Sequence, residues 1–236
     1  MKQAFFYIDQ IPAVLYGEDA QRVWLFVHGK CGCKEEGADF ARIVCPRGTQ
    51  VLAVDLPGHG ARRDGPGFDP WHTVPELRNV MAYLRQRWGH IALRANSLGA
   101  WFSMLAFADT PPEKALLVSP VLDMGKLIGN MMLWAKVSPA QLEREGEIPT
   151  SFRETLSWRY WQYAKAHPII KWNTATEILY AGQDHLTDQD TAADFARRFS
   201  CGLTVMKNGE HWFHTPEQLE FLRAWVDRYG VEWSMM

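Results

Sequence analysis

The stretch LRANSLGAWF, residues 93–102, decides how the rest of the sequence is interpreted. It joins HIALRANS (90–97), typical of a buried strand, to LGAWFSMLAFAD (98–109), which is apolar at helical spacing and nearly all round. A serine at a sharp strand-to-helix turn holds its hydroxyl above the sheet, where the helix dipole favours negative charge. Ser97 is therefore a candidate nucleophile, with an ordinary helix N-cap as the alternative.

The residues around Ser97 depart from the usual pattern for such a turn. The serine normally lies in Gly-x-Ser-x-Gly, whereas here the stretch reads Ala95-Asn96-Ser97-Leu98-Gly99. Both flanking positions must be small because the backbones crowd at the turn, and alanine is small. Alanine accepts a positive φ less readily than glycine. We therefore expect Ala95 to weaken the motif without breaking its physical requirement.

Strand-like and helix-like segments alternate along most of the chain. Strands are expected at 4–8, 13–17, 23–29, the start of 50–60, 90–97, 114–123, 176–184 and 203–211. Helices are expected near 36–45, 74–88, 98–109, 188–199 and 216–229. The first two strands flank Gln10-Ile11-Pro12 and are expected to pair antiparallel at a sheet edge. This alternation predicts an α/β fold, with a mostly parallel central sheet and helices on both faces.

Residues 124–174 interrupt the alternation, because no strand-like run occurs in them. Ser138-Pro139 is typical of a helix start, and Ser151-Phe152-Arg153-Glu154 fits a capping box that opens a helix up to about His167. We expect a core domain of residues 1–123 and 175–236, and a small helical cap insertion, 124–174, over one end of the sheet. The aromatic residues of the cap are expected to pack it onto the core, with a few lining an apolar pocket.

Composition excludes several classes of function. The 236 residues are 47% hydrophobic and 22% charged, and their net charge of −2 without a basic block argues against nucleic-acid binding. The first residues lack a signal-peptide core and no run is long enough to span a membrane, so we expect a cytoplasmic protein without stable membrane insertion. The cysteines, Cys31, Cys33, Cys45 and Cys201, are expected to be reduced thiols. No metal or cofactor is expected, because no second ligand pair accompanies Cys31 and Cys33.

Polar residues follow the predicted strands at the edge where ligands bind in parallel α/β sheets. They occur in the motifs VHG (27–29), DLPGHG (55–60), NSLG (96–99), AGQD (181–184) and GEHWF (209–213). Outside 124–174, these motifs and their order resemble the α/β-hydrolase-fold serine hydrolases. The resemblance implies that DLPGHG shapes a loop and that His59 is not catalytic.

The same resemblance implies a catalytic triad in the order Ser, Asp, His. Ser97 would be the nucleophile, His211 the general base, and Asp184 the acid that orients the histidine. His214 competes with His211 for its role. Asp123, which ends the preceding strand, and Asp188 and Asp190, which also suit a helix cap, remain alternatives to Asp184.

The resemblance also implies an oxyanion hole of two backbone N–H groups. They belong to Leu98 and Lys30, with Cys31 as the alternative to Lys30. The Lys30 side chain is expected to reach solvent or, less commonly, an anionic substrate. Cys31, Trp101 and Trp212 are expected to border the pocket.

These expectations favour a serine hydrolase that cleaves a small or medium carboxylic ester, or a related acyl substrate, through an acyl-enzyme. A carbon–carbon bond hydrolase of the same fold is the alternative, motivated by Asn96 before Ser97 and Trp212 after His211. A non-catalytic ligand-binding relative is a further alternative. The substrate, the oligomeric state and the role of Arg94, just inside the strand end, remain open.

Overall fold

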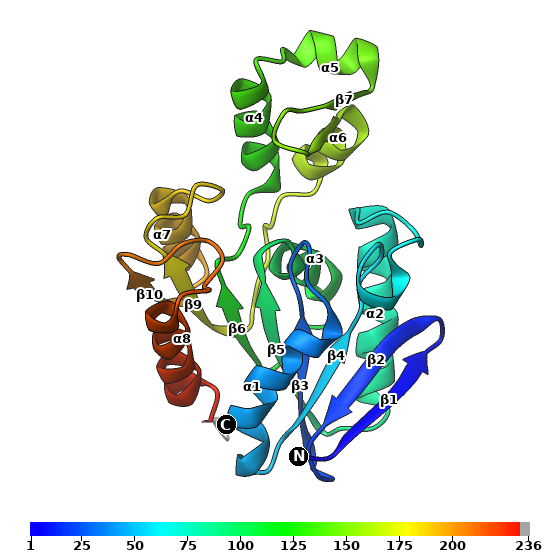
Figure 1. The fold of residues 1–236 in the computed structure, drawn as a ribbon, viewed down its shortest axis with the longest axis vertical. Helices are drawn as coiled ribbons and strands as arrows, with labels where there is room; N and C mark the ends of the chain where they lie inside the picture. The colour runs from blue at the N-terminus through cyan, green and yellow to red at the C-terminus, as the bar shows by residue number, and fades with distance from the viewer. Residues whose placement is uncertain (232–236) are drawn as a thin grey trace.

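The computed structural model describes residues 1–231, and its centre is an eight-stranded sheet in the order β1-β2-β4-β3-β5-β6-β9-β10 (Figure 1). The strands are β1 Gln3–Ile8, β2 Ile11–Tyr16, β3 Arg22–Val27, β4 Gln50–Val54, β5 His90–Asn96, β6 Lys114–Val118, β9 Ala175–Ala181 and β10 Gly202–Met206. β2 pairs antiparallel with β1 and with β4, and the remaining neighbours are parallel. The predicted edge hairpin and the mostly parallel sheet are confirmed.

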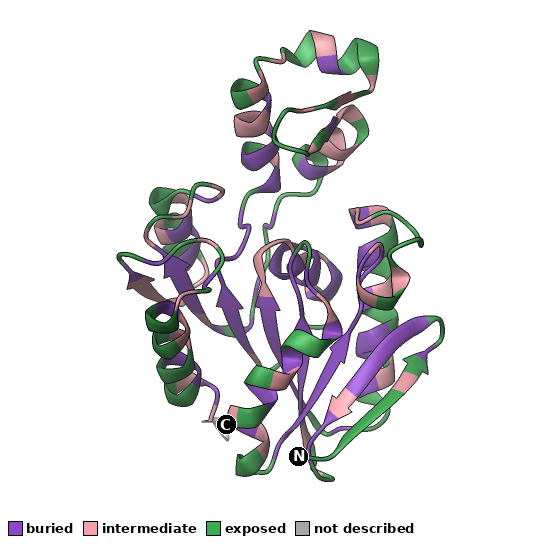
Figure 2. Ribbon diagram, viewed as in Figure 1, coloured by how far each residue is buried: buried purple, intermediate pink, exposed green. Residues whose placement is uncertain are grey.

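Helices cover both faces of this sheet, as predicted (Figure 1). The core helices are α1 Gly37–Val44, α2 Pro70–Arg85, α3 Ser97–Phe107, α7 Gln189–Arg198 and α8 Pro216–Tyr229, with short 3-10 helices at Lys34–Glu36, Cys45–Arg47 and Gly60–Arg62. α2, α3 and α7 contribute to the apolar cluster on one face, and α1 and α8 to the cluster on the other. The central strands β3, β4 and β5 are largely buried between these layers (Figure 2), because both of their faces are covered.

Capping residues set where several helices begin. Asp69 accepts a hydrogen bond from the His72 amide, and Pro70 follows at the first helical position, so α2 begins before the expected 74. Thr215 and Pro216 open α8 in the same way, and α8 spans the residues expected for it. Pro139 follows Ser138 at the start of a cap helix, as predicted.

The cap consists of α4 Met124–Ala135, α5 Pro139–Glu145, β7 Glu147–Pro149, β8 Thr155–Ser157 and α6 Trp158–Ala166. It stands above the carboxyl ends of the parallel strands, joined to the core by two extended segments (Figure 1). The expectation that these residues hold no strand is wrong, because β7 and β8 form an antiparallel pair.

The helix expected from Ser151 to about His167 is present, but it begins later than predicted. Ser151 lies in the turn between β7 and β8, and α6 begins at Trp158, where Ser157 caps it by accepting from the Tyr160 amide. The Thr150 hydroxyl donates to the Glu154 carbonyl at 2.7 Å and accepts from the Glu154 amide at 3.1 Å. These bonds close the hairpin, so tertiary pairing prevails over a local capping signature.

Few polar contacts tie the cap to the core. Lys30 pairs with Glu154 of the β7–β8 hairpin, and Lys126 of α4 pairs with Asp188 at 2.6 Å. All four side chains are between one third and one half exposed, so each pair contributes little to stability. Across residues 1–231, no helix is both long and apolar enough to cross a membrane.

Candidate active site

Ser97 lies at a sharp turn between β5 and α3. Its φ of 48° is left-handed, a conformation that costs a non-glycine residue free energy and is found mainly where function requires it. Asn96 before it is extended, and Ser97 is the first residue of α3. The turn is therefore a strained elbow rather than a relaxed helix start.

Crowding at the elbow comes from the loop after β3. A Cβ on Gly99 would lie 2.2 Å from the His28 carbonyl oxygen, so no larger residue fits there without movement of the backbone. Ala95 is instead an ordinary residue of β5, fully buried and paired with Val27 and Leu117. The positive φ belongs to Ser97 and not to Ala95, so the expectation that alanine weakens the turn through its poor tolerance of positive φ is wrong.

The predicted catalytic side chains meet at the carboxyl edge of the sheet. Ser97 Oγ lies 2.8 Å from His211 Nε2, and His211 Nδ1 lies 2.7 Å from Asp184 Oδ2. The Asp184 side chain is fully buried and that of His211 is 15% exposed. A hydroxyl, an imidazole and a buried carboxylate in this order can activate the hydroxyl as a nucleophile.

Backbone hydrogen bonds hold the two loops that carry His211 and Asp184. Asp184 Oδ1 accepts from the Leu186 amide at 2.8 Å, which leaves Oδ2 for the histidine. The Gln183 amide donates to the Gly209 carbonyl at 2.8 Å, which ties the loop after β9 to the loop after β10. His211 lies five residues beyond β10, not directly after a strand as expected.

The other acidic candidates have structural contacts instead. Asp188 caps α7 and pairs with Lys126, whose hydrogen bond is the main reason that the pKa of Asp188 falls to about 2. Asp123 caps α4 by accepting from the Lys126 amide. Asp190 lies in the first turn of α7. None of the three has a hydrogen bond to His211 among residues 1–231.

His214, the alternative base, lies outside the Ser97 contact. Its Nδ1 donates to the Trp212 carbonyl at 2.7 Å, its ring stacks on that of Trp212, and Glu210 lies 3.3 Å away. The side chain is exposed to solvent. The structure therefore brings His211, and not His214, to the serine.

The loop after β3 holds the proposed oxyanion donors. The Cys31 amide donates to His59 Nε2 at 2.9 Å, so it is engaged and the alternative to Lys30 is disfavoured. Leu98 lies in the first turn of α3, where N–H groups have no intrahelical acceptor. Lys30 and Leu98 both line the cavity described below. The Lys30 side chain pairs with Glu154 of the cap, and not with any group at the bottom of the site.

A buried polar network beneath this loop was not predicted from the sequence. Asp55, fully buried, accepts from the Lys34 amide at 2.8 Å, from Lys34 Nζ at 2.8 Å and from the Ala61 amide at 3.0 Å. Burial opposes its ionisation, but these hydrogen bonds hold the pKa of Asp55 below its usual value. The feature of the sequence that could have revealed this network is Asp55, a charged residue directly after a buried strand.

His28 and His59 complete the network. His28 Nδ1 donates to the Gly29 carbonyl at 2.7 Å, and Nε2 accepts from the Leu56 amide at 3.0 Å. Burial lowers the pKa of His28 to about 4, so the ring is neutral at neutral pH. His59 donates to the Pro57 carbonyl at 2.8 Å while accepting from Cys31. These contacts support the structural role expected for the DLPGHG segment.

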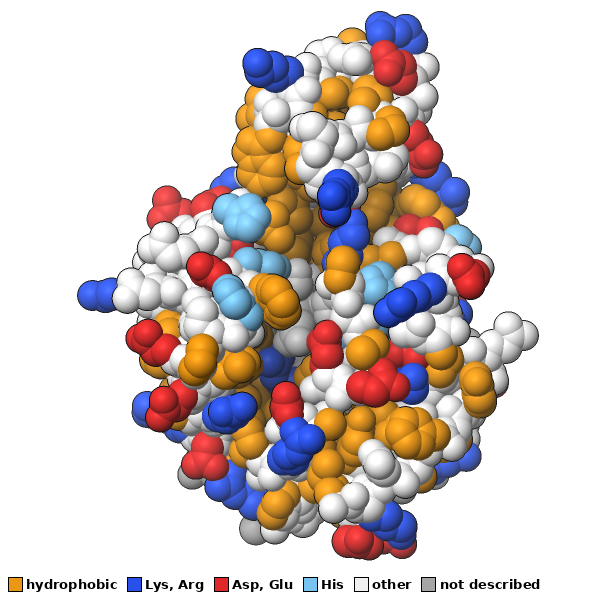
Figure 3. All heavy atoms as spheres, in the orientation of Figure 1, with side chains coloured by type: hydrophobic (Ala, Val, Ile, Leu, Met, Phe, Trp, Pro, Cys, Tyr) orange, Lys and Arg blue, Asp and Glu red, His pale blue; other side chains and the backbone are white. Residues whose placement is uncertain are grey.

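Ser97 and His211 line a cavity of about 1430 Å³ between the core and the cap. Its upper part is apolar, lined by cap residues that include Leu127, Ile128, Met131, Phe152, Leu156 and Tyr160. Figure 3 shows hydrophobic side chains gathered where the cap meets the core, above a hollow that continues downward. The site therefore suits an organic substrate with a sizeable apolar part.

Of the three residues expected to border the pocket, two line the cavity and one does not. Cys31 and Trp212 line the cavity, and Trp212 is 76% exposed. Trp101 does not: it is 2% exposed, and its ring stacks on that of Tyr160, which lines the cavity. The expectation for Trp101 is wrong because an apolar residue one turn after the serine can face the core as readily as the site.

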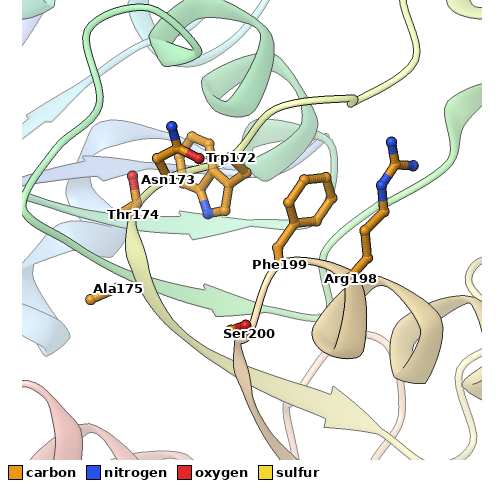
Figure 4. Close-up of a pocket in the computed structure, with 7 residues that line it drawn as sticks. All are labelled: Trp172, Asn173, Thr174, Ala175, Arg198, Phe199 and Ser200. Carbon is orange, nitrogen blue, oxygen red and sulfur yellow. The ribbon is translucent and has the colours of Figure 1, made fainter.

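A second hollow, of about 400 Å³, lies at the amino end of β9 (Figure 4). It is lined by residues 172–175 and 198–200 and contains none of the candidate catalytic residues. Within residues 1–231, no cluster of three or more His, Cys, Asp or Glu side chains is placed to hold a metal ion. Cys31, Cys33, Cys45 and Cys201 are free thiols.

Several solved structures share this fold over nearly the whole chain. Est1E from Butyrivibrio proteoclasticus with bound ferulic acid has a TM-score of 0.73 at 17% identity, covering 97% of this chain and 98% of that one. A putative hydrolase from Agrobacterium vitis S4 gives 0.74 at 16% identity, with 98% and 99% covered. Esterase Pf2001 of Pyrococcus furiosus gives 0.69 at 14%, with 97% and 88% covered. At these identities the similarity shows the fold alone.

Comparison with curated proteins gives no match. The model of one family, described as the alpha/beta hydrolase family, matches residues 24–225, which include the elbow serine and both of its partners. The match extends over most of the sequence and agrees with the sheet order and with the solved structures. The chain therefore belongs to the alpha/beta hydrolase family.

Proposed function

We propose that this protein is a serine hydrolase that cleaves carboxylic esters through an acyl-enzyme, with Ser97, His211 and Asp184 as its triad. The observation that carries the proposal is the continuous hydrogen-bonded chain from Ser97 Oγ through the His211 ring to Asp184 Oδ2. Ser97, at one end of this hydrogen-bonded chain, lines the large cavity, so a substrate can reach it. Membership of the family supports hydrolase chemistry in general.

The reaction follows from this geometry. Ser97 Oγ attacks the acyl carbon while His211 Nε2 takes its proton, and Asp184 stabilises the resulting imidazolium. The backbone amides of Leu98 and Lys30 hold the negative charge on the carbonyl oxygen. The C–O bond then breaks, and His211 gives the proton to the leaving alkoxide. Water, deprotonated by His211, attacks the acyl-enzyme and releases the acid and the free serine.

An ester is the proposed substrate because the upper cavity is apolar while the serine lies at its polar floor. Two of the similar structures are named for ester cleavage or for a bound carboxylic acid, which motivates esters as the first compounds to test. The carbon–carbon bond alternative rested partly on Asn96. Its side chain accepts from Arg94, so it has a partner on its own strand and needs no substrate to explain it.

Labelling with a fluorophosphonate probe tests the proposal. The wild-type protein should be labelled, and Ser97→Ala should lose the label completely. Ser103→Ala is the matched control, because Ser103 lies on the same helix, is buried and donates to the Gly99 carbonyl. A panel of 4-nitrophenyl esters of increasing acyl length should then give turnover. Labelling that survives in Ser97→Ala, or hydrolysis of vinylogous diketone acids without any ester turnover, would contradict the proposal.

A further inference from the structure

Arg94 is a buried cation in an apolar setting. It lies two residues before the end of β5, paired in register with Phe26 of β3 and Leu116 of β6, and its residue exposure is 3%. The Phe26 and Phe40 rings lie 5.9 Å and 6.0 Å from its guanidinium carbon. A buried arginine normally has a carboxylate partner, because desolvating an unpaired charge is costly.

The guanidinium group of Arg94 is only partly satisfied. Nη1 donates to the Ala95 carbonyl at 3.1 Å and to Asn96 Oδ1. Nε is buried and has no hydrogen-bond partner, and no carboxylate within residues 1–231 forms an ion pair with the group. Burial lowers the pKa of Arg94 to about 9, so the side chain still carries its charge at neutral pH. Arg94 is therefore a buried cation that keeps one donor, Nε, unpaired.

The Arg94 side chain borders the same cavity as the serine. Arg94 lines the cavity, together with Phe40 and Ile43 of α1 and Leu222 and Val226 of α8. We call these five residues the lower lobe. Figure 3 shows the hollow running down between the two sides of the core, with basic side-chain atoms visible inside it. The lower lobe therefore combines apolar walls with a positive charge.

The other charged groups around the lower lobe do not neutralise Arg94 directly. Glu36 lines the cavity and acts on Arg94 at a distance, but the two form no ion pair, and burial raises the pKa of Glu36. A Cβ added to Gly32 would lie 2.9 Å from Glu36 Oε1, so this carboxylate packs against the loop backbone. Arg223 of α8 adds a second, exposed cation to the cavity wall.

Resting on the proposed function, we propose that the substrate carries a carboxylate and that Arg94 binds it in the lower lobe. The planar guanidinium presents parallel N–H groups that match the two oxygens of a carboxylate. Arg94 precedes Ser97 by three residues, which places their Cα atoms within about 10 Å at the rise of a strand. Its bond to Asn96 holds the head group beside the residue that precedes Ser97. A short chain between ester and carboxylate therefore spans the two sites.

Ser119 offers a second polar group to the same ligand region. It follows β6, whose last residue pairs with Asn96, and its side chain is buried and lines the cavity. Its Oγ also has no hydrogen-bond partner. Arg94 and Ser119 each keep one unpaired polar atom beside this cavity, which suits a ligand that is polar at this end.

Binding of glutarate to Ser97→Ala tests the site without turnover. Titration calorimetry at fixed ionic strength should detect glutarate binding, and adding Arg94→Met to Ser97→Ala should weaken it at least 10-fold, since a charge-assisted bidentate contact is lost. Arg94→Lys should recover part of the affinity. Arg87→Met is the matched control, because Arg87 is an exposed arginine on the Tyr83 ring outside the cavity, and it should bind glutarate as Ser97→Ala does. Equal affinity with and without Arg94, or tighter binding of inorganic phosphate than of glutarate, would overturn the proposal.

Kinetics give the second readout. Wild-type kcat/KM should be higher for at least one acid ester than for its neutral analogue: mono-4-nitrophenyl glutarate against 4-nitrophenyl valerate, or 3-carboxyphenyl butyrate against phenyl butyrate. These pairs place the acid on the acyl side or on the leaving group. Arg94→Met should reduce that preference at least 10-fold, whereas Arg87→Met should retain it. A wild-type enzyme without preference for either acid ester would overturn the proposal.

These outcomes separate this inference from the proposed function. Absence of fluorophosphonate labelling would end the esterase proposal, while Arg94-dependent glutarate binding would still establish the anion site. Conversely, labelling with no role for Arg94 in binding or preference would leave an esterase of neutral esters. The thermal midpoint of Arg94→Met checks folding, and it should be no lower than that of the wild type, because methionine suits an apolar setting better than an unpaired cation.

Discussion

Asp184 and His211 form a contact that fixes the histidine ring in one orientation. Asp184 Oδ2 lies 2.7 Å from His211 Nδ1, while Asp184 Oδ1 accepts from the Leu186 amide at 2.8 Å. Because both carboxylate oxygens are engaged and the side chain is fully buried, the group has little freedom to rotate. His211 Nε2 is thereby directed at Ser97 Oγ.

This contact predicts opposite results for two neighbouring aspartates. Asp184→Asn should lower kcat by about 10⁴, because the histidine loses the tautomer that accepts the serine proton. Asp188→Ala removes the cap of α7 and should cost about 1 kcal/mol in the free energy of unfolding, with kcat little changed. Ester hydrolysis rates and urea unfolding measure both. A large loss of kcat in Asp188→Ala with an active Asp184→Asn would show that the acid is misassigned.

Gly99 and Gly129 provide a matched pair of glycine substitutions. Gly99→Ala should lower kcat at least 100-fold or prevent folding, because the new Cβ would lie 2.2 Å from the His28 carbonyl oxygen. Gly129→Ala, within α4, meets no atom within 4 Å and should raise the free energy of unfolding by about 0.5–1 kcal/mol through helix propensity. Activity and urea unfolding of the two variants check this. An active, stable Gly99→Ala would mean that the elbow is less crowded than described.

His28 predicts how stability depends on pH. Its pKa is about 4 in the folded protein, because burial disfavours the charged ring, against about 6.5 when unfolded. Between these values the unfolded chain binds a proton that the folded protein does not, so stability falls as pH falls through this window, by about 3 kcal/mol in total. Urea unfolding from pH 7 to pH 4 should show this loss. His28→Gln should reduce the slope, and an unchanged slope would assign the effect to another group.

The parallel pairing of most strands and the residues at the carboxyl edge of the sheet could be predicted because both depend on chain-wide patterns. Apolar runs separated by helix-length segments specify parallel pairing, and polar residues at the ends of such strands meet at one edge. Ser97, Asp184 and His211 come together for this reason. What the pattern left open was which aspartate contacts the histidine, since each of them follows a strand or begins a helix.

The sequence predictions that were wrong or incomplete failed for a different physical reason. Ser151 to Glu154 match a helix-capping signature, yet a hairpin forms because β7 and β8 find pairing partners that local sequence does not reveal. Trp101 lies on a helix that is apolar all round, so periodicity could not say which side faces the site. The role of Arg94 could not be inferred from the sequence, because it depends on the lack of a carboxylate partner among the described residues and on an unpaired Nε, which only three-dimensional packing shows.

Ala95 provides the test of how the elbow tolerates its missing glycine. Ala95 is fully buried between Val27 and Leu117 and does not line the cavity, so its side chain supports β5 and not the substrate. Ala95→Gly should cost about 0.5–1 kcal/mol in stability, because glycine weakens a strand, and should leave kcat within about threefold. Ala95→Val should cost about 1–3 kcal/mol from overpacking and lower kcat more strongly, because the end of β5 must shift and displace Ser97 from His211. Urea unfolding and ester turnover separate the two effects. A fully active and equally stable Ala95→Val would mean that the space beside β5 is not the constraint, and that the strain of the elbow resides in the left-handed backbone of Ser97 alone.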